Sequence, residues 1–361
     1  MKYKLLFDEL DKRKRVVYDY LFSKRYSARF QTKHIHDSVY SYMKLGGKSL
    51  RPAVLLFSCG VVGGDEQKAI PAAAAVEVFH TWTLVHDDII DRDKTRRGGL
   101  AVHEEFRQRA IDEFGYPPLE AQHYGMSIAM LAGDMQQGWA VSMLTELTTQ
   151  CGIRPEVALY LIDDSEMRVL GTLIDGEVRD IQFSKQPIES LDEELILDML
   201  WKKTGALYEF SGKAGAMIGL NTDDPEHELV AAILNFAGKC GIAFQLQDDI
   251  LGILGDEETL GKPVGSDIRE GKRTTIVYHS FKNANAAQRN FLLSVLGNAQ
   301  AEKAEVQKTM EIFLDLGGVE YTAKLAQSYI NEAIIYLDKL PNSKYKQLLA
   351  MWADYMIERT F

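Results

Sequence analysis

The chain has 361 residues, of which 46% are hydrophobic and 26% charged, an ordinary balance for a globular protein with a large core. Its formal net charge of −11 at pH 7 argues against a nucleic-acid partner, because such proteins generally present a basic face. Residues 1–20 carry many charges and no apolar run, so no signal peptide is expected, and no uninterrupted apolar stretch approaches the roughly 18 residues of a membrane span.

The chain has three cysteines and one dense basic run. Cys59, Cys151 and Cys240 are far apart and odd in number, which fits reduced, buried thiols and predicts a cytoplasmic protein. The basic run at residues 12–15 is interpreted as a solvated helix face.

Apolar residues recur at helical spacing almost throughout, and no convincing alternating strand is found. Glycine, proline and capping residues separate the helical segments, but none of these breaks is a long, polar linker. The sequence therefore predicts one all-α domain over residues 1–361. The expected helices cover residues 52–62, 69–91, 125–147, 155–183, 191–218, 226–254 and 321–340.

The first motif with recognisable chemistry is GGKSLRP at residues 46–52. Its two glycines allow the backbone to approach a ligand closely, and Lys48 and Arg51 are three apart and can project together. By itself the motif is equally compatible with a glycine-rich turn before a helix that carries two solvated cations.

Three carboxylates, Asp87, Asp88 and Asp91, interrupt the apolar helical run at residues 77–91. Asp87 and Asp91 lie about 40° apart around a helix and share one face, on which His80 also falls. Two carboxylates one turn apart repel each other unless a cation lies between them, and hard oxygen ligands favour Mg²⁺. An isolated match of this kind also occurs at solvated acidic helix ends.

Two further features favour a metal and phosphate site. Arg96 and Arg97 follow the carboxylates closely, and guanidinium groups bind phosphate. A second acidic pair, Asp248 and Asp249, interrupts another apolar helical run. If the two helices face each other, they form opposite walls of a cavity with metal sites at its mouth.

GGKSLRP, HDDIID followed by TRRG, WKKTGAL, FQLQDD and GKPVGSD occur in this order between residues 46 and 274. Together they resemble the trans-isoprenyl diphosphate synthases, most closely the short-chain geranylgeranyl and farnesyl diphosphate synthases of archaeal type. The resemblance implies a large all-α helical bundle around a deep central cavity, usually a homodimer. It also implies a prenyltransferase that condenses isopentenyl diphosphate with an allylic diphosphate.

The resemblance implies Mg²⁺ as the cofactor, with two or three ions per active site and Mn²⁺ as an alternative ion. Asp87 and Asp91 match direct ligands, and Asp248 matches the ligand of the second motif. Gly252 stands where the family has a further carboxylate, which leaves the coordination number there open. The positions matching the two metal motifs are Asp87, Asp88, Asp91, Asp248 and Asp249.

The resemblance also assigns substrate contacts. Arg96 matches a residue that contacts the allylic diphosphate. Lys203, Thr204 and Gln245 match residues beside the reacting carbons, where their dipoles face developing positive charge. The residues matching contacts to isopentenyl diphosphate are Lys48, Arg51, His80 and Arg97, and those expected to hold the leaving diphosphate are Lys203, Lys262 and Lys272.

Several assignments have plainer alternatives. Lys203 and Thr204 alone are compatible with an exposed helical pair, and His80 with a core histidine. The segment GEVRD at residues 176–180 resembles the family's GQxxD, with Glu177 in place of glutamine and no assigned role.

Two other classes of protein are weighed against the synthase. Two E-x-x-H sequences, at residues 77–80 and 120–123, allow a di-iron carboxylate bundle. That site needs a glutamate from each of two further helices and leaves the basic motifs unexplained. The other class is a non-catalytic subunit of a heteromeric synthase, which typically lacks the aspartate motifs.

Product length is predicted from the helix that carries the first acidic motif. The growing chain must extend away from the metals toward earlier turns, at about 5.4 Å per turn. Thr83, one turn before Asp87, is small, whereas Trp82 flanks the same stripe and is bulky. An aromatic only at the position of Trp82 resembles the archaeal geranylgeranyl type, so mainly C20 is expected, with C25 or C15 as alternatives. Plain core packing is the alternative role for Trp82.

Overall fold

The computed structural model describes residues 2–255 and 265–359. The chain divides into two compact units, each with a core of buried apolar side chains. It is helical almost throughout, which confirms the predicted all-α class. A single domain over residues 1–361 stays a prediction. The units comprise Met1–Ile162 with Ala214–Pro225, and Asp163–Lys213 with Glu226–Phe361.

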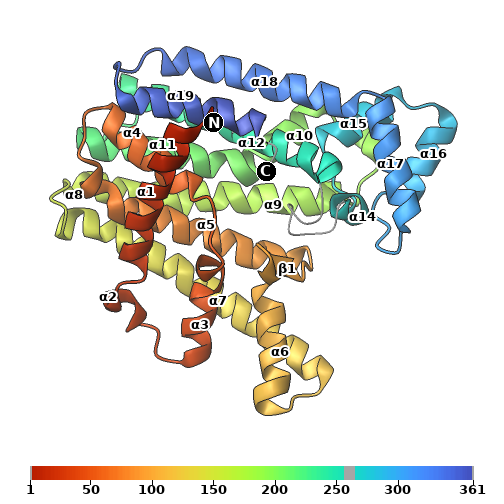
Figure 1. Ribbon diagram of the computed structural model, residues 1–361, viewed down its shortest axis with the longest axis horizontal. Helices are drawn as coiled ribbons and strands as arrows, with labels where there is room; N and C mark the ends of the chain where they lie inside the picture. The colour runs from red at the N-terminus through yellow and green to blue at the C-terminus, as the bar shows by residue number, and fades with distance from the viewer. Residues whose placement is uncertain (1, 256–264, 360–361) are drawn as a thin grey trace. The chain divides into compact units, whose positions relative to one another are not determined.

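The described elements of the first unit are helical except for one two-stranded hairpin. They are α1 (Lys4–Leu21), α2 (Lys24–Ser27), α3 (Lys33–Lys44), α4 (Leu50–Val61), the 3₁₀ turn η1 (Glu66–Ala69), α5 (Ile70–Ile90), β1 (Thr95–Arg96), β2 (Gly99–Leu100), α6 (Val102–Phe114), α7 (Pro118–Thr149) and α8 (Pro155–Asp163). Helices α5 and α7 lie side by side (Figure 1), and Tyr42, Val85, Phe106 and Ile128 form a core where α3, α5, α6 and α7 meet. This core holds the C-terminal half of α5, which carries the first acidic motif.

The sequence of α5 explains its packing and its ends. Pro71 lies in the first turn, where its fixed backbone angle suits a helix start. Residues 72–75 are buried alanines, whose small side chains let neighbouring helices approach closely. The helix ends at Ile90 with Asp91 as its C-cap, which confirms the predicted segment.

No strand is predicted from the sequence, yet Thr95–Arg96 and Gly99–Leu100 pair as antiparallel strands. Arg97 and Gly98 form the turn, with φ of 54° and 75°. Positive φ at both central residues is the geometry of a type I′ turn, whose twist matches that of the paired strands. Strands of two residues are too short for alternation to reveal them. The hairpin returns the chain to α5 and brings Arg96 beside the acidic motif.

The second unit includes two π-helical segments, η2 and η4, among its described helices. Its elements are η2 (Asp164–Val169), α9 (Leu170–Phe183), the 3₁₀ turn η3 (Ile188–Ser190), α10 (Glu193–Leu200), η4 (Trp201–Gly205), α11 (Ala206–Leu220, which ends in the first unit), α12 (Glu228–Leu254), α14 (Ser266–Glu270), α15 (Thr275–Asn283), α16 (Ala286–Val295), α17 (Lys303–Asp315), α18 (Gly318–Leu337) and α19 (Lys344–Glu358). Helices α12 and α18 lie side by side, and α19 packs on both (Figure 1). Helix α12, which carries the second acidic motif, is therefore held by the C-terminal part of the chain.

All seven predicted segments are helical, but two of them contain the π-helical segments η2 and η4. A π-helical turn takes in one more residue than an α-helical turn and often marks a functional site. One helix outside the predicted segments, α1, has a narrow apolar face. In α1 the buried apolar residues are Leu6, Leu10, Val17 and Leu21, a thin stripe among many charges.

Helix α12 is, within residues 2–255 and 265–359, the one helix long and apolar enough to cross a membrane. Its most apolar window has a mean hydropathy of 1.6 and is 56% buried. The buried core helix of a globular protein meets the same criterion, so length and composition are weak support for a membrane span.

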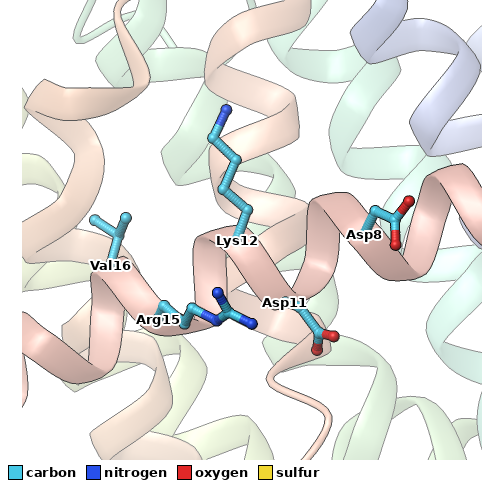
Figure 2. Close-up of a pocket in the computed structure, with 5 residues that line it drawn as sticks. All are labelled: Asp8, Asp11, Lys12, Arg15 and Val16. Atoms are coloured by element: carbon cyan, nitrogen blue, oxygen red, sulfur yellow. The ribbon is translucent and has the colours of Figure 1, made fainter.

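A hollow of about 380 Å³ lies on one face of α1 (Figure 2). It is lined by Asp8, Asp11, Lys12, Arg15 and Val16, and by no residue of the sequence motifs. Lys12 and Arg15 are exposed, as the interpretation of the basic run requires.

One residue of the basic run corrects that interpretation. Arg13 is only 6% exposed. Its guanidinium donates to Glu9 Oε2 (2.5 Å) and Glu66 Oε2 (2.8 Å), so it holds α1 against η1 instead of facing solvent.

Candidate active site

The first acidic motif lies at the C-terminal end of α5. The backbone N–H of Asp91 donates to the carbonyl oxygen of Asp87 (2.8 Å) and closes the last turn. Asp87 and Asp91 are half-buried, whereas Asp88 is fully buried. The two carboxylates predicted to share a face are therefore accessible to a ligand.

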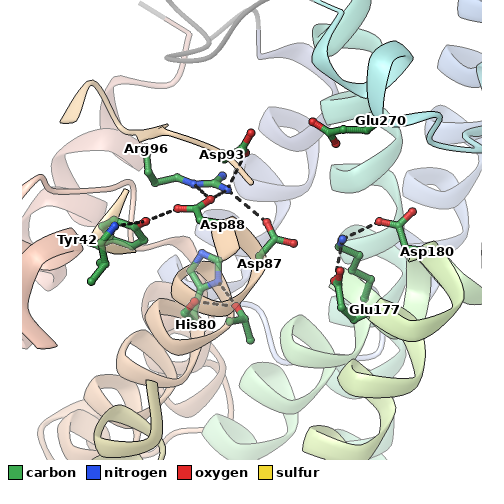
Figure 3. Close-up of polar contacts among 12 residues, drawn as sticks. Tyr42, His80, Asp87, Asp88, Asp93, Arg96, Glu177, Asp180 and Glu270 are labelled. Atoms are coloured by element: carbon green, nitrogen blue, oxygen red, sulfur yellow. Dashed lines mark hydrogen bonds and ion pairs between the residues drawn. The ribbon is translucent and has the colours of Figure 1, made fainter. Parts of the chain in front are cut away.

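Arg96 binds this motif from the hairpin (Figure 3). Its Nε donates to Asp88 Oδ1 (2.8 Å), and its Nη2 lies 3.3 Å from Asp87 Oδ2 and 3.5 Å from Asp93 Oδ2. The hydroxyl of Tyr42 donates to the other oxygen of Asp88. Burial alone would lower the pKa of Arg96, but its hydrogen bond to Asp88 and the nearby negative charges outweigh burial and raise it. Asp88 therefore anchors a charged guanidinium beside the two accessible carboxylates.

The loop GGKSLRP is held against the same hairpin. Arg97 donates from Nη1 to the carbonyl oxygens of Gly46 and Tyr42, the latter at 3.1 Å. A Cβ at Gly47 would lie 2.8 Å from Cζ of Arg97, so a larger residue there would displace this guanidinium. Lys48 is exposed next to it. Two motifs some 50 residues apart in sequence thus meet, as the interaction between residues 46 and 97 shows.

His80 lies among three arginines. Arg51 Nη1 is 3.2 Å from His80 Nε2, and because guanidinium only donates, Nε2 is the acceptor. The imidazole proton is then on Nδ1, which faces Thr83 Oγ1 at 3.4 Å. Burial, followed by the charges of Arg51, Arg97 and Arg96, holds the pKa of His80 well below its usual value, so the ring is neutral at pH 7. The converging cations form a site suited to an anion, and His80 contributes to it without charge.

The di-iron alternative is not supported. Glu77 is 1% exposed, and its Oε1 accepts hydrogen bonds from Ser49 (2.9 Å) and Tyr18 (3.1 Å). Glu120 and His123 are exposed in the first turns of α7. Glu77 therefore supports the loop that carries Lys48, because it holds the side chain of Ser49. The backbone of Ser49 is left-handed at this point, with φ of 46°.

In the second unit, η4 brings Lys203 to the GEVRD segment of α9. Lys203 Nζ lies 2.7 Å from Asp180 Oδ2 and 2.8 Å from Glu177 Oε2 (Figure 3). Lys272 Nζ is 3.8 Å from the same oxygen of Asp180. A Cβ at Gly176 would lie 2.5 Å from the backbone nitrogen of Lys203, so glycine permits this contact between helices. Two of the predicted diphosphate-binding lysines therefore converge on GEVRD.

Thr204, Gln245 and Asp249 form a chain of hydrogen bonds. Thr204 Oγ1 donates to Gln245 Oε1 (2.7 Å), and Gln245 Nε2 donates to Asp249 Oδ1 (2.9 Å). Thr204 and Asp249 are both buried. The alternative of Lys203 and Thr204 as an exposed helical pair is therefore wrong.

Asp248, the first residue of the second motif, has a 40% exposed side chain and accepts a hydrogen bond from Arg359 Nη2 (2.5 Å). Gly252 lies one turn further along α12. A Cβ at Gly252 would be 3.1 Å from Asp267 Oδ2, so a carboxylate from α14 lies beside the position that lacks one. The second acidic site is thus built from two elements and not from α12 alone.

The donor groups fit Mg²⁺ held together with a substrate. The described residues contain no group of three His, Cys, Asp or Glu side chains that could hold a metal by themselves. Mg²⁺ usually keeps several waters and is bound by one or two carboxylates and by phosphate oxygens. Asp249 Oδ2 is buried and has no hydrogen-bond partner among the described residues. Burial, and then the charges of Asp267, Asp248 and Asp180, raise the pKa of Asp249 well above its usual value, and a divalent cation would offset that repulsion.

The structure brings together most of the predicted residues within each unit, and Lys262 lies outside the described residues. Sequence reasoning missed Tyr42, Asp93, Asp267 and Arg359. Asp267 stands inside GKPVGSD, so its motif was available as a signal. Tyr42 and Arg359 are remote in sequence from the aspartates that they bind, and no local pattern marks them.

The sequence model for the polyprenyl synthetase family matches residues 32–313. The chain therefore belongs to this family, whose members are prenyltransferases with an all-α fold. The chain is 35% identical over 307 residues to the geranylgeranyl diphosphate synthase of Sulfolobus acidocaldarius, a match that covers 85% of this chain and 84% of that protein.

Solved structures agree with this assignment. Geranylgeranyl pyrophosphate synthetase from Pyrococcus horikoshii matches with a TM-score of 0.82 and 33% identity, covering 99% of this chain and 100% of that one. Geranylgeranyl pyrophosphate synthase from Corynebacterium glutamicum, complexed with isoprenyl diphosphate and magnesium, matches with a TM-score of 0.79 and 25% identity, covering 99% and 98%.

Proposed function

We propose that the protein is a Mg²⁺-dependent geranylgeranyl diphosphate synthase that condenses isopentenyl diphosphate with allylic diphosphates and releases mainly the all-trans C20 product. The observation that carries the proposal is the convergence of Arg51, Arg96 and Arg97 around a neutral His80, beside the accessible Asp87. A cationic site next to carboxylates suits a diphosphate together with Mg²⁺.

Residues of the first unit bind the two diphosphates in this proposal. Arg51, His80 and Arg97, with the exposed Lys48, hold isopentenyl diphosphate. Arg96 contacts the allylic diphosphate from its anchor on Asp88. Arginine is suited to this role because its planar fork matches phosphate geometry and stays charged.

Asp87, Asp91 and Asp248 are the proposed metal ligands, for two or three Mg²⁺ ions or for Mn²⁺ in their place. When bound, Mg²⁺ neutralises the allylic diphosphate as a leaving group. Lys203 and Lys272 also hold that group.

Other residues of the second unit act on the hydrocarbon. The hydrogen-bond chain from Thr204 to Gln245 fixes dipoles that stabilise positive charge on the allylic carbons. The allylic C–O bond breaks and releases diphosphate, and the double bond of isopentenyl diphosphate attacks the allylic carbon to form the new C–C bond. Loss of a proton to the departing diphosphate then gives a prenyl diphosphate longer by five carbons. The reaction needs no nucleophilic side chain from the protein.

Label transfer tests this function. Purified protein is incubated with labelled isopentenyl diphosphate and, in turn, with dimethylallyl, geranyl and farnesyl diphosphate, and the extractable label is measured. We expect incorporation with Mg²⁺ and at least one primer, and none after removal of divalent ions by a chelator. A protein that binds these diphosphates but transfers no label would support a non-catalytic subunit instead.

Adding the missing carboxylate should bring little benefit. In Gly252→Asp the new side chain would crowd Asp267 Oδ2, which lies 3.1 Å from the ideal Cβ, and would add negative charge near Asp248 and Asp249. We expect turnover to change far less than in Asp248→Ala, by under about tenfold, which is about 1.4 kcal/mol in barrier height.

Gly252→Ala is the control that separates crowding from charge in steady-state assays of the purified variants. A large gain in turnover by Gly252→Asp would show that the number of metal ligands limits the natural chain.

We also propose a homodimer, with α9 at its interface. Ile174 and Ile181 are exposed on α9 and seven residues apart, and Gly171 and Val178 fill the alternate positions. The exposed Met167 precedes them in η2. Apolar residues at alternating spacings of four and three are typical of a helix that packs against another helix. A second copy of the chain is the natural occupant, because an isologous contact needs one self-complementary patch on each subunit.

A charged residue placed among these exposed apolar residues of α9 should dissociate the dimer. For Ile174→Glu we expect a monomer at micromolar concentration by sedimentation equilibrium, because the interface would bury a carboxylate without a partner. Ile335→Glu is the matched control, since Ile335 is 63% exposed on α18 and should tolerate the charge. A dimeric Ile174→Glu variant, or a monomeric wild type, would contradict the proposed interface.

The proposed location is the cytoplasm. All three cysteines are free thiols, and Cys59 and Cys240 are buried. Free thiols are usual in a reducing compartment.

A further inference from the structure

Arg359 connects the end of α19 to the second acidic motif. Its side chain is 5% exposed. Nη2 donates to Asp248 Oδ1 (2.5 Å) and to the carbonyl oxygen of Phe244 (2.9 Å), and Nε donates to the carbonyl oxygen of Met356 (3.2 Å). The guanidinium also stacks on Phe244, with Cζ 3.8 Å from the ring centroid. These contacts leave the guanidinium one orientation.

The backbone of Arg359 also contacts α12. Its carbonyl oxygen accepts from Gln247 Nε2 of α12 (3.3 Å), while its N–H donates to the carbonyl oxygen of Tyr355 in α19 (3.2 Å). Gln247 immediately precedes Asp248. Side chain and backbone therefore both contact α12 between residues 244 and 248.

We propose that Arg359 is a positioning residue for the second metal site, where it holds Oδ1 of Asp248 so that this carboxylate faces a Mg²⁺–diphosphate complex. The inference rests on the proposed function, in which Asp248 is a metal ligand. Asp248 keeps 40% of its side chain exposed, so the contact leaves the carboxylate accessible. Metal-binding carboxylates are commonly oriented in this way, and loss of the orienting group typically lowers metal affinity about 10–100-fold.

Orientation and charge make opposite predictions for this arginine. As a positive charge, Arg359 opposes a cation at Asp248, so removing it would tighten metal binding. As an orienting group, it keeps Asp248 in place against repulsion from Asp249, so removing it would weaken metal binding. The four contacts of its guanidinium favour orientation, because a simple counter-charge needs no fixed plane.

Binding of Mn²⁺ in the presence of inorganic diphosphate tests the inference without turnover. The full chain is titrated by calorimetry as wild type and as Arg359→Gln, Arg359→Lys and Asp248→Asn, the last of which identifies the part of the signal that belongs to the second motif. We expect Arg359→Gln to lower that affinity at least about tenfold. Arg359→Lys should lose nearly as much, because an ammonium group lacks the planar fork that reaches all three acceptors.

Lys239→Gln is the matched control. Lys239 Nζ pairs with Glu332 Oε2 at 2.5 Å and ties α12 to α18, away from Asp248. This variant should bind Mn²⁺ like the wild type. If Arg359→Gln does not fold, as judged by thermal denaturation, Arg359→Lys decides the test.

The outcomes separate the inference from the function on which it rests. Unchanged or tighter binding in the Arg359 variants, with Asp248→Asn weakened, would overturn the role of Arg359 and leave the proposed function intact. Normal binding by Asp248→Asn would remove Asp248 from the metal site and overturn the inference with it. Failure of the wild type to form a prenyl product would count against the proposed function alone.

Discussion

Replacing Asp87 or Asp91 with alanine is expected to lower turnover at least about a hundredfold, which is about 2.7 kcal/mol in barrier height, without unfolding the protein. Both carboxylates are half-buried at the end of α5 and accessible to a metal. The core that contains Val85 and Ile128 includes neither carboxylate and should hold the helix in both variants. Steady-state product formation and thermal denaturation measure the two parts of this prediction.

Asp88→Ala is the contrasting variant. Asp88 is fully buried and accepts hydrogen bonds from Arg96 and Tyr42, so its loss leaves the half-buried guanidinium of Arg96 without its main partner. Removing one member of a buried ion pair typically costs about 3–5 kcal/mol of stability. We therefore expect a lower melting temperature for Asp88→Ala and near-normal melting for the other two. Near-normal turnover by Asp87→Ala or Asp91→Ala would refute the metal assignment.

Replacing Trp82 with alanine is expected to lengthen the product from C20 to C25 or beyond. In this proposal its indole blocks the growing chain, and alanine removes that block. The structure also gives the packing alternative a definite form, because the ring of Trp82 lies edge-on to Phe79 and His86, at 5.2 and 5.5 Å between centroids. Chromatography of the dephosphorylated products distinguishes the two roles.

Stability provides the second half of that test. A packing role predicts a lower melting temperature with an unchanged C20 peak. The loss in free energy of unfolding should be less than the roughly 3–5 kcal/mol typical of a core tryptophan, because Trp82 is only half-buried. Trp82→Phe is the matched control, since it keeps an aromatic ring in place and should keep the product at C20. A folded Trp82→Ala variant that still makes only C20 would end the blocking hypothesis.

The sequence predicts the helices well because burial of one helix face requires apolar residues at helical spacing. This spacing can be read from the sequence without knowledge of the fold. Helix α5 is an example, with a predicted range of 69–91 and an observed range of Ile70–Ile90. The hairpin that carries Arg96 has no such period, and it depends on positive φ at Arg97 and Gly98. The hairpin is recognised only in the folded chain, where it packs beside α5.

The candidate site divides in the same way. Motif residues such as Lys203 and Gln245 are found from the sequence because WKKTGAL and FQLQDD are contiguous motifs that resemble those of the family. Tyr42 and Arg359 are not, because each binds an aspartate that is distant in sequence, at Asp88 and Asp248. Contacts of this kind follow from tertiary packing, and local patterns carry no trace of them.

The mass of the prenyl product tests the central proposal most directly. Wild-type protein is incubated with Mg²⁺, isopentenyl diphosphate and farnesyl diphosphate, and the dephosphorylated product is identified by liquid chromatography and mass spectrometry. We expect one dominant C20 alcohol that disappears when divalent ions are removed. Absence of any product longer than the primer, or formation of product without divalent ions, would contradict the assignment of a Mg²⁺-dependent synthase.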